Sequence, residues 1–160
     1  MSAGSWESFS GALDDERRLL GELGAAALAL TTALVSGAPA DVELSERKLE
    51  AQRVLYSHAH TSRTAMQQRG FGELTLQQVC AYAPGPLRRC VYTALHEITT
   101  NGIALQLTVN NNKALILAGM ERLTRTVEVL QQTMNEQPGT YKRRGIVPPA
   151  NGSVIVSRKA

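Results

Sequence analysis

The longest helical pattern of the chain occupies residues 95–130, which read LHEITTNGIALQLTVNNNKALILAGMERLTRTVEVL. Its apolar residues recur three and four positions apart, and residues at that spacing share one face of an α-helix. The pattern therefore predicts a long helix with a stripe that is buried against another surface. The pattern stops before Pro138 and Gly139, a pair that ends a helix. The positions of the stripe are mostly apolar or small and follow a heptad spacing: Leu95, Ile98, Gly102, Leu105, Val109, Asn112, Ile116, Gly119, Leu123, Thr126 and Leu130.

Asparagines interrupt this stripe at residues 110–112. An asparagine at an interior position can specify the register of a helix pair at a cost in stability. Alternatively, it marks a face that is only half buried and that a partner helix completes. The sequence leaves both interpretations open. Because little patterned chain remains to cover the distal half of the helix, we expect a partner-binding surface there, formed by Val109, Asn112, Ile116, Leu123, Val127 and Leu130.

Two further long helices are predicted before this one. Residues 5–36 place apolar side chains on strict heptad positions, with Glu16 as the one exception. Residues 42–69 carry a weaker stripe, with Asp41 as the expected N-cap and Gly70 as the expected stop. The short connection through residues 37–41 predicts an antiparallel hairpin. The two stripes are Trp6, Phe9, Leu13, Leu20, Leu23, Ala27, Leu30 and Leu34, and then Leu44, Leu49, Ala51, Leu55, Tyr56, Ala59 and Met66.

A short helix separates the hairpin from the long final helix. Thr75 and Gln78 form a capping-box pattern at its start, and Pro86 is expected at the first position of the final helix, which runs to about Glu136. The predicted fold class is therefore all-α: a coiled-coil-like bundle of three to four helices over residues 1–137. Residues 138–160 are expected to form an extended basic tail that is flexible or depends on a partner. The expected core includes Leu13, Leu20, Leu23, Leu30, Leu95 and Leu105.

Composition favours one helical domain. The chain has 160 residues, of which 43% are hydrophobic and 19% are charged, so it can bury a core. It contains no run of eighteen apolar residues and no signal-peptide pattern, so we expect no membrane insertion and a cytoplasmic location, with Cys80 and Cys90 as free thiols. The total charge of +3 includes five basic residues and no acidic one after Gln137, which leaves −2 for the rest of the chain.

No pattern in the sequence indicates catalysis, a metal or a cofactor. His58 and His60 are two residues apart and point to different faces of a helix, and His96-Glu97 lacks a second ligand at helical spacing. Asp14, Asp15 and Glu16 are interpreted as a solvated face, although Glu16 intrudes on the heptad. Phosphate-binding loops, dinucleotide-binding turns and nucleophile elbows are absent. We therefore expect a protein that is not an enzyme.

The layout resembles the FlgN family of flagellar type III export chaperones. Members have two long N-terminal helices, a short break, and a long helix with an Asn-rich stretch before an apolar run, followed by a tail with tyrosine and glycine. The matching segments are Val109-Asn110-Asn111-Asn112-Lys113-Ala114-Leu115-Ile116 and Thr140-Tyr141-Lys142-Arg143-Arg144-Gly145. Lys113 stands where the family commonly has glycine, and the tail is more basic.

This resemblance implies a cytoplasmic chaperone whose clients are hook-associated proteins with aggregation-prone terminal helices. The apolar stripe would then bind the client, while Tyr141, Lys142, Arg143 and Arg144 would dock at the export gate. No cofactor or nucleic acid is implied, and weak self-association through the stripe is left open. One alternative is a helical adaptor or chaperone of another secretion system, which shares the stripe but needs no tail. The other is a nucleic-acid binder that uses the basic tail.

Overall fold

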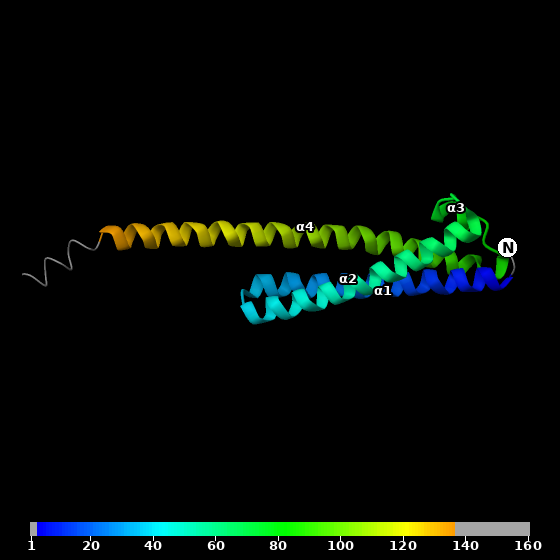
Figure 1. Cartoon of the computed structure of the whole chain (residues 1–160), viewed down its shortest axis with the longest axis horizontal. Helices are drawn as coiled ribbons and strands as arrows, with labels where there is room; N and C mark the ends of the chain where they lie inside the picture. Colours follow the sequence, from blue (N-terminus) through cyan, green and yellow to red (C-terminus); the bar gives the residue numbers. More distant parts are fainter. Residues whose placement is uncertain (1–2, 137–160) are drawn as a thin grey trace, which may run out of the picture. The chain divides into compact units, whose positions relative to one another are not determined.

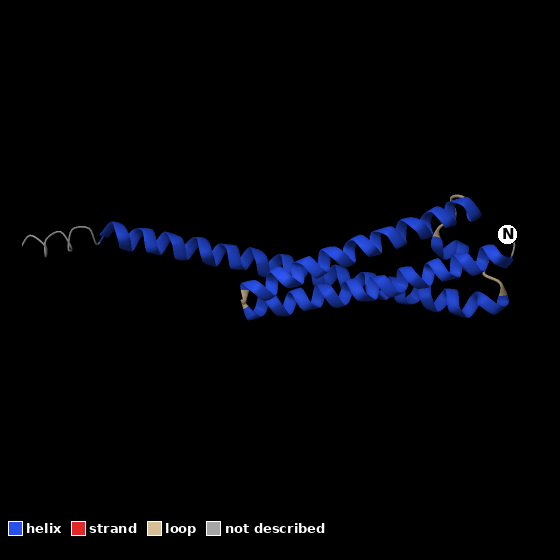
Figure 2. Cartoon of the chain, turned by 60° about the horizontal axis from the view of Figure 1, so that its bottom comes forward, coloured by secondary structure: helices blue, strands red, loops and turns tan. Residues whose placement is uncertain are grey.

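The computed structural model describes residues 3–136, which form four α-helices joined by short loops (Figure 1). The helices are α1 (Ala3–Ser36), α2 (Pro39–Phe71), α3 (Leu76–Ala81) and α4 (Gly85–Glu136). The described part contains helices and loops and no strand (Figure 2). Helix α4 is continuous, but the chain divides into two compact units at residue 116, and each unit is described separately below. The all-α prediction is confirmed.

Helices α1 and α2 form the predicted antiparallel hairpin. Gly37 ends α1 with a φ of 72°, a conformation that glycine adopts without strain, and its N–H donates to the Ala33 carbonyl at 3.1 Å. The heptad residues of α1 are its buried face, as the sequence predicts. Those that are fully or almost fully buried are Trp6, Phe9, Leu13, Leu20, Leu23, Ala27 and Leu30.

The predicted ends of α2 are each wrong by two or three residues. Pro39 begins the helix, because its fixed φ is suited to the first helical position, and Ala38 takes the N-cap position in place of Asp41. The negative charge of Asp41 lies in the first turn, where it favours the positive end of the helix. Gly70 lies inside the helix, and Gly72 ends it with a φ of 64°.

The predicted apolar stripe of α2 is also partly wrong. Leu44, Leu55 and Met66 are exposed, whereas the fully buried residues of this helix are Arg63 and Gln67. The inward face of α2 is therefore partly polar. An apolar count along the helix cannot identify such a face, because the burial of polar residues depends on the partners that another helix supplies.

The hydrophobic core of the first unit brings together α1, α3 and the start of α4. Thr75 and Gln78 form the predicted capping box of α3. Three aromatic rings pack edge to face in and against this core, with centroid distances of 4.8 Å from Trp6 to Phe71 and 5.4 Å from Phe9 to Phe71. The buried residues of this core are Trp6, Phe9, Leu13, Val79, Cys80, Ala83, Val91 and Ala94.

Within the first unit, α4 runs parallel to α1. Arg17 Nη1 lies 2.6 Å from Glu97 Oε2, and further along Asn112 Nδ2 donates to the Ala27 carbonyl at 3.0 Å. Of the expected core residues, Leu95 and Leu105 on α4 are only half-buried, while the four leucines on α1 are buried.

Helix α1 also meets a simple test for a membrane span. Over Ser5–Ser36 it is long and apolar enough to cross a bilayer by length and composition, a test that the core helix of a soluble protein passes as well. In this structure one face of α1 packs within the first unit and carries the buried, ion-paired Glu16. Length and composition alone do not distinguish the two cases, and the absence of membrane insertion stays a prediction.

Candidate protein-binding surface

The described part of the second unit, residues 117–136, is the distal part of α4, and it carries a continuous row of exposed apolar side chains. We call this row the distal seam. Its members follow one another at alternating steps of three and four residues, the spacing by which one helix packs against another. Each side chain is 50–73% exposed. The distal seam consists of Met120, Leu123, Val127, Leu130 and Met134.

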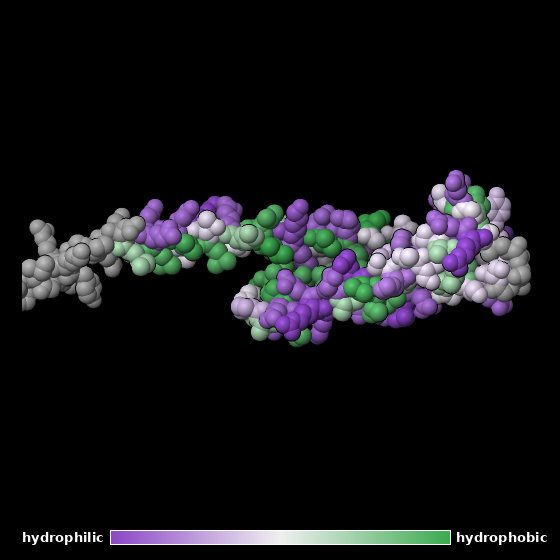
Figure 3. All heavy atoms as spheres, viewed as in Figure 1, coloured by the Kyte–Doolittle hydropathy of each residue, from purple (hydrophilic) through white to green (hydrophobic). Residues whose placement is uncertain are grey.

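The charged side chains of this segment lie on the opposite face of the helix. Arg125 Nη2 pairs with Glu121 Oε1 at 2.5 Å, an exposed pair four residues apart. Arg122 and Glu128 lie on the same half of the helix by the 3.6-residue periodicity. Figure 3 shows the resulting separation, with hydrophilic side chains along one edge of distal α4 and hydrophobic ones along the other. The segment is therefore amphipathic, with an unpartnered apolar face in the described residues.

Of the residues predicted to bind a partner, three belong to the distal seam. Leu123, Val127 and Leu130 are all at least half exposed. Val109 and Ile116 lie in the first unit and are 45% and 40% exposed. These five side chains are accessible at the surface of the described chain. Tyr141, Lys142, Arg143 and Arg144 lie outside the described residues.

Asn112 differs from the rest of the predicted set. Its side chain is only 5% exposed, because Nδ2 donates to the Ala27 carbonyl and Oδ1 lies 2.7 Å from the Thr31 hydroxyl. Both of its polar atoms are thus engaged by α1. This corrects its assignment to an exposed partner-binding surface. Of the two interpretations, an interior asparagine that fixes helix register fits its position.

Two members of the distal seam, Met120 and Met134, were missed by the sequence prediction. The predicted stripe continued through Gly119 and Thr126, which lie on one flank of the seam. The sequence contains a more regular apolar row than the stripe that was predicted. Its residues alternate four and three positions apart, and every one is apolar: Ile116, Met120, Leu123, Val127, Leu130 and Met134.

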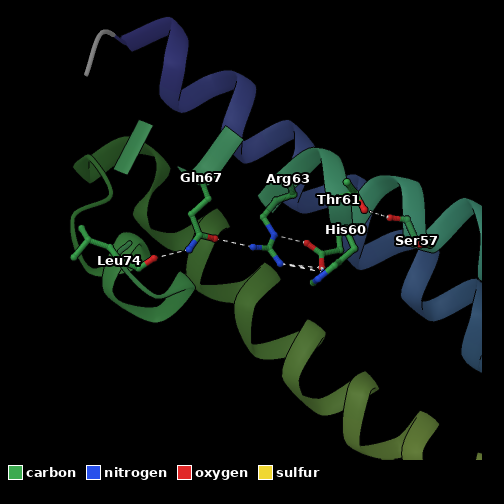
Figure 4. Close-up of polar contacts among 7 residues, drawn as sticks. Ser57, His60, Thr61, Arg63, Gln67 and Leu74 are labelled. Atoms are coloured by element: carbon green, nitrogen blue, oxygen red, sulfur yellow. Dashed lines mark hydrogen bonds and ion pairs between the residues drawn. The ribbon is translucent and has the colours of Figure 1, made fainter. Parts of the chain in front are cut away.

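Three of the four buried polar residues among those described in the first unit, Glu16, Arg63 and Gln67, form a network between α1 and α2 (Figure 4). Arg63 Nε donates to Glu16 Oε2 at 2.6 Å, and His60 Nδ1 lies 2.7 Å from Glu16 Oε1. Arg63 also donates to Gln67 Oε1 at 2.7 Å, and Gln67 in turn donates to the Leu74 carbonyl at 2.6 Å. The network therefore connects the hairpin to the loop that precedes α3.

Glu16 is the centre of this network, which corrects its interpretation as part of a solvated face. Burial by itself acts to raise the pKa of the Glu16 carboxyl, but hydrogen bonds and charge attraction from Arg63 and His60 outweigh it, so the pKa is lowered. The carboxylate is therefore ionised and paired at neutral pH. His60, which the sequence placed among ordinary surface histidines, is half exposed and takes part in this pairing.

The other reactive side chains of the first unit do not assemble into a site. Cys80 lies in the core, where burial raises the pKa of its thiol, while Cys90 is an exposed free cysteine. Among residues 3–136, no group of three or more His, Cys, Asp or Glu side chains is arranged to hold a metal ion. The network around Glu16 links α1, α2 and the loop before α3, so we interpret it as structural.

Comparison of the chain with known protein families, with curated proteins and with solved structures finds no match. The described residues form an all-helical fold, and the comparisons assign no family. The distal seam is the feature of the described residues that bears most directly on function, because exposed apolar helix faces are typical of protein-binding surfaces.

Proposed function

We propose that the chain is an export chaperone that binds aggregation-prone terminal helices of flagellar hook-associated proteins in the cytoplasm and delivers them to the type III export gate. The observation that carries the binding part of this proposal is the exposure of the distal seam. The flagellar part depends on the resemblance to the FlgN family in residues 109–116 and 140–145. The two parts can be tested separately.

The energetics of the distal seam suit a chaperone that must release its client. Burying one leucine or methionine side chain contributes about 1.5–3 kcal/mol, and the seam offers five large apolar side chains. Ordering of side chains and loss of translational freedom offset much of that gain. The expected result is reversible binding of moderate affinity, driven by apolar burial and needing no nucleotide or metal.

The basic tail gives the second part of the proposed mechanism. Tyr141 offers a large contact area and one hydroxyl at low entropic cost, and Lys142, Arg143 and Arg144 can steer it to an acidic surface. In the resembled family that surface belongs to the export gate. We therefore assign client binding to distal α4 and delivery to the tail.

The test replaces Leu123 and Leu130 with lysine in the full chain and measures binding to purified hook-associated proteins by calorimetry. Two lysines on the distal seam place charges where apolar contact is required, so binding is expected to be lost. Circular dichroism should show a folded protein, because both side chains are exposed. Val129→Lys is the matched control, since Val129 is an exposed apolar residue on another face of the same segment.

A parallel variant, Tyr141→Ala, separates binding from delivery. It should leave client affinity unchanged and lower export and motility in cells. Undiminished client binding by the double lysine variant would overturn the proposed binding surface. If the seam variant loses binding to a partner from a different secretion system, while hook-associated proteins never bind the native chain, the adaptor alternative is favoured instead.

A further inference from the structure

The uncharged face of distal α4 is wider than the distal seam itself. Two rows of residues flank the seam, and neither row contains a charged side chain. At about 100° per residue, the seam and both flanks together cover about 200° of the helix surface. The first flank consists of Leu117, Thr124 and Gln131, and the second of Gly119, Thr126 and Thr133.

The threonine hydroxyls on both flanks are already satisfied by the helix that carries them. Thr124 donates to the Met120 carbonyl at 3.0 Å, Thr126 to Arg122 at 2.9 Å and Thr133 to Val129 at 2.8 Å. A donor that keeps its hydrogen bond can be covered without the penalty of an unsatisfied polar group. These three threonines therefore allow a dry contact on either side of the seam.

One flank also leaves room for close approach. Apart from the neighbouring backbone of its own helix, a Cβ atom added at Gly119 would meet no atom within 4 Å in the described structure, so no packing contact there requires glycine. Glycine weakens an exposed helix relative to alanine. Its presence on the flank is suited to a partner backbone that packs closely against α4.

A single partner helix does not need a face of this width. In a two-stranded coiled coil the apolar contact is confined to the seam, and the flanking positions are commonly occupied by charged residues that form ion pairs across the interface. On distal α4 the described charged residues instead lie outside the seam and its flanks, and Arg125 is paired with Glu121. The flanks thus have the composition of packed positions.

We infer that distal α4 binds two amphipathic helices of its client at once, one over each flank, with the distal seam between them. This inference rests on the proposed function and specifies the partner: a pair of helices with apolar inner faces, and without charges that must meet α4. Because none of the seam and flank residues is charged, the affinity should change little with salt concentration.

The test places charge on one flank at a time in the full chain. The two variants are Thr124→Lys with Gln131→Lys, and Thr126→Lys with Thr133→Lys. If each flank is covered by a helix, each variant buries unpaired charge. The dissociation constant for a purified hook-associated protein should then rise about a hundredfold. A client that docks one helix in the seam would tolerate lysine on at least one flank, as coiled coils do.

Matched controls separate the effect of the added charge from the effects of a changed side-chain shape and of unfolding. Alanine at the same four positions should retain binding within about threefold, since it keeps the flanks uncharged. Gln132→Lys places the same charge on the far side of the helix and should have no effect. Circular dichroism of every variant should match that of the native chain, because lysine is a good helix former.

Each outcome decides between the proposals. Loss of binding in both lysine variants supports the two-helix inference, and retained binding in either one overturns it. Normal binding by the variant with Leu123→Lys and Leu130→Lys would instead reject the proposed function. Light scattering on the free native chain adds a further arm: a stable dimer that dissociates in the flank variants would assign the uncharged face to a second copy and overturn the inference.

Discussion

The two parts of α4 both carry side chains at heptad spacing, but they differ in what these side chains contact. In the first unit, Val91 and Ala94 are buried in the core, and Asn112 is hydrogen-bonded to α1. In the second unit, the same spacing gives a row in which Leu123 is 68% exposed. A heptad therefore indicates that a face is suited to burial, but the availability of a second helix decides whether it is buried.

Polar residues mark the difference between the two units as clearly as apolar ones. The first unit buries Glu16, Arg63, Gln67 and Asn112, and each has a specific partner on another element. Distal α4 carries its polar groups either as exposed ion pairs or as threonines bonded to their own helix. Buried polar contacts fix one arrangement of helices, whereas the distal seam is free of such constraints and suits an exchangeable partner.

Removal of Arg63 should cause the largest loss of stability. Arg63→Ala leaves the Glu16 carboxylate buried with His60 as its remaining partner, and loss of one member of a buried ion pair typically costs about 3–5 kcal/mol. Chemical denaturation of the full chain measures the change. Arg125→Ala, which breaks an exposed ion pair in the second unit, is the matched control and should change stability very little. Equal effects of the two substitutions would contradict the distinction between the units.

A pair of leucines compares apolar packing in the two units. Leu20 is 3% exposed, so Leu20→Ala should lower the free energy of unfolding by about 2–5 kcal/mol through the cavity that it leaves. Leu123→Ala removes the same atoms from a solvated position and should change it by less than about 0.5 kcal/mol. Thermal unfolding followed by circular dichroism measures both. A large effect at Leu123 would mean that the seam is covered in the free protein, by its own chain or by a second copy.

Much of the architecture could be predicted from the periodicity of apolar residues and from residues that begin or end helices. The strict heptad of α1, the Thr75–Gln78 capping box and the length of α4 were each readable from the sequence, because they depend on local spacing and local hydrogen bonds. The ends of α2 were predicted less accurately. Asp41 and Gly70 are residue types that commonly begin and end helices, but the helix begins at Pro39 and ends before Gly72. At each end of α2 two residues were suitable, and the sequence alone did not decide between them.

The buried polar residues could not be predicted in the same way. Glu16 occupies a heptad position, but its burial depends on Arg63, which is 47 residues away and enters only when α2 folds back on α1. Asn112 likewise depends on Ala27 and Thr31 across the parallel pair of α1 and α4. The apolar row of the distal seam was predicted more fully because it depends on local spacing, and its exposure was expected because little patterned chain remains to cover it. Only its two methionines were missed.

The smallest expected effect concerns the pH dependence of the Glu16 network. The pKa of Glu16 is lower in the folded chain than in the unfolded one, so the unfolded state binds more protons as the pH falls. The stabilisation from this carboxylate is therefore complete above about pH 4.3, the ordinary value for glutamate, and is lost as the pH falls through the lower folded-state pKa. His60 and Arg63 face the carboxylate from α2. Burial raises the pKa of Tyr56, and the Glu16 charge raises it further.

The comparison of native protein with Glu16→Gln isolates this term from other carboxylates. The difference in unfolding free energy between the two should be largest at pH 7 and should shrink as the pH is lowered toward 3, measured by urea denaturation at each pH. Glu121→Gln in the second unit serves as the control, and its difference from the native chain should stay small throughout. A Glu16→Gln difference that is independent of pH would show that the carboxylate is held by shape rather than by charge, because a paired, ionised Glu16 links the stability of the first unit to proton binding.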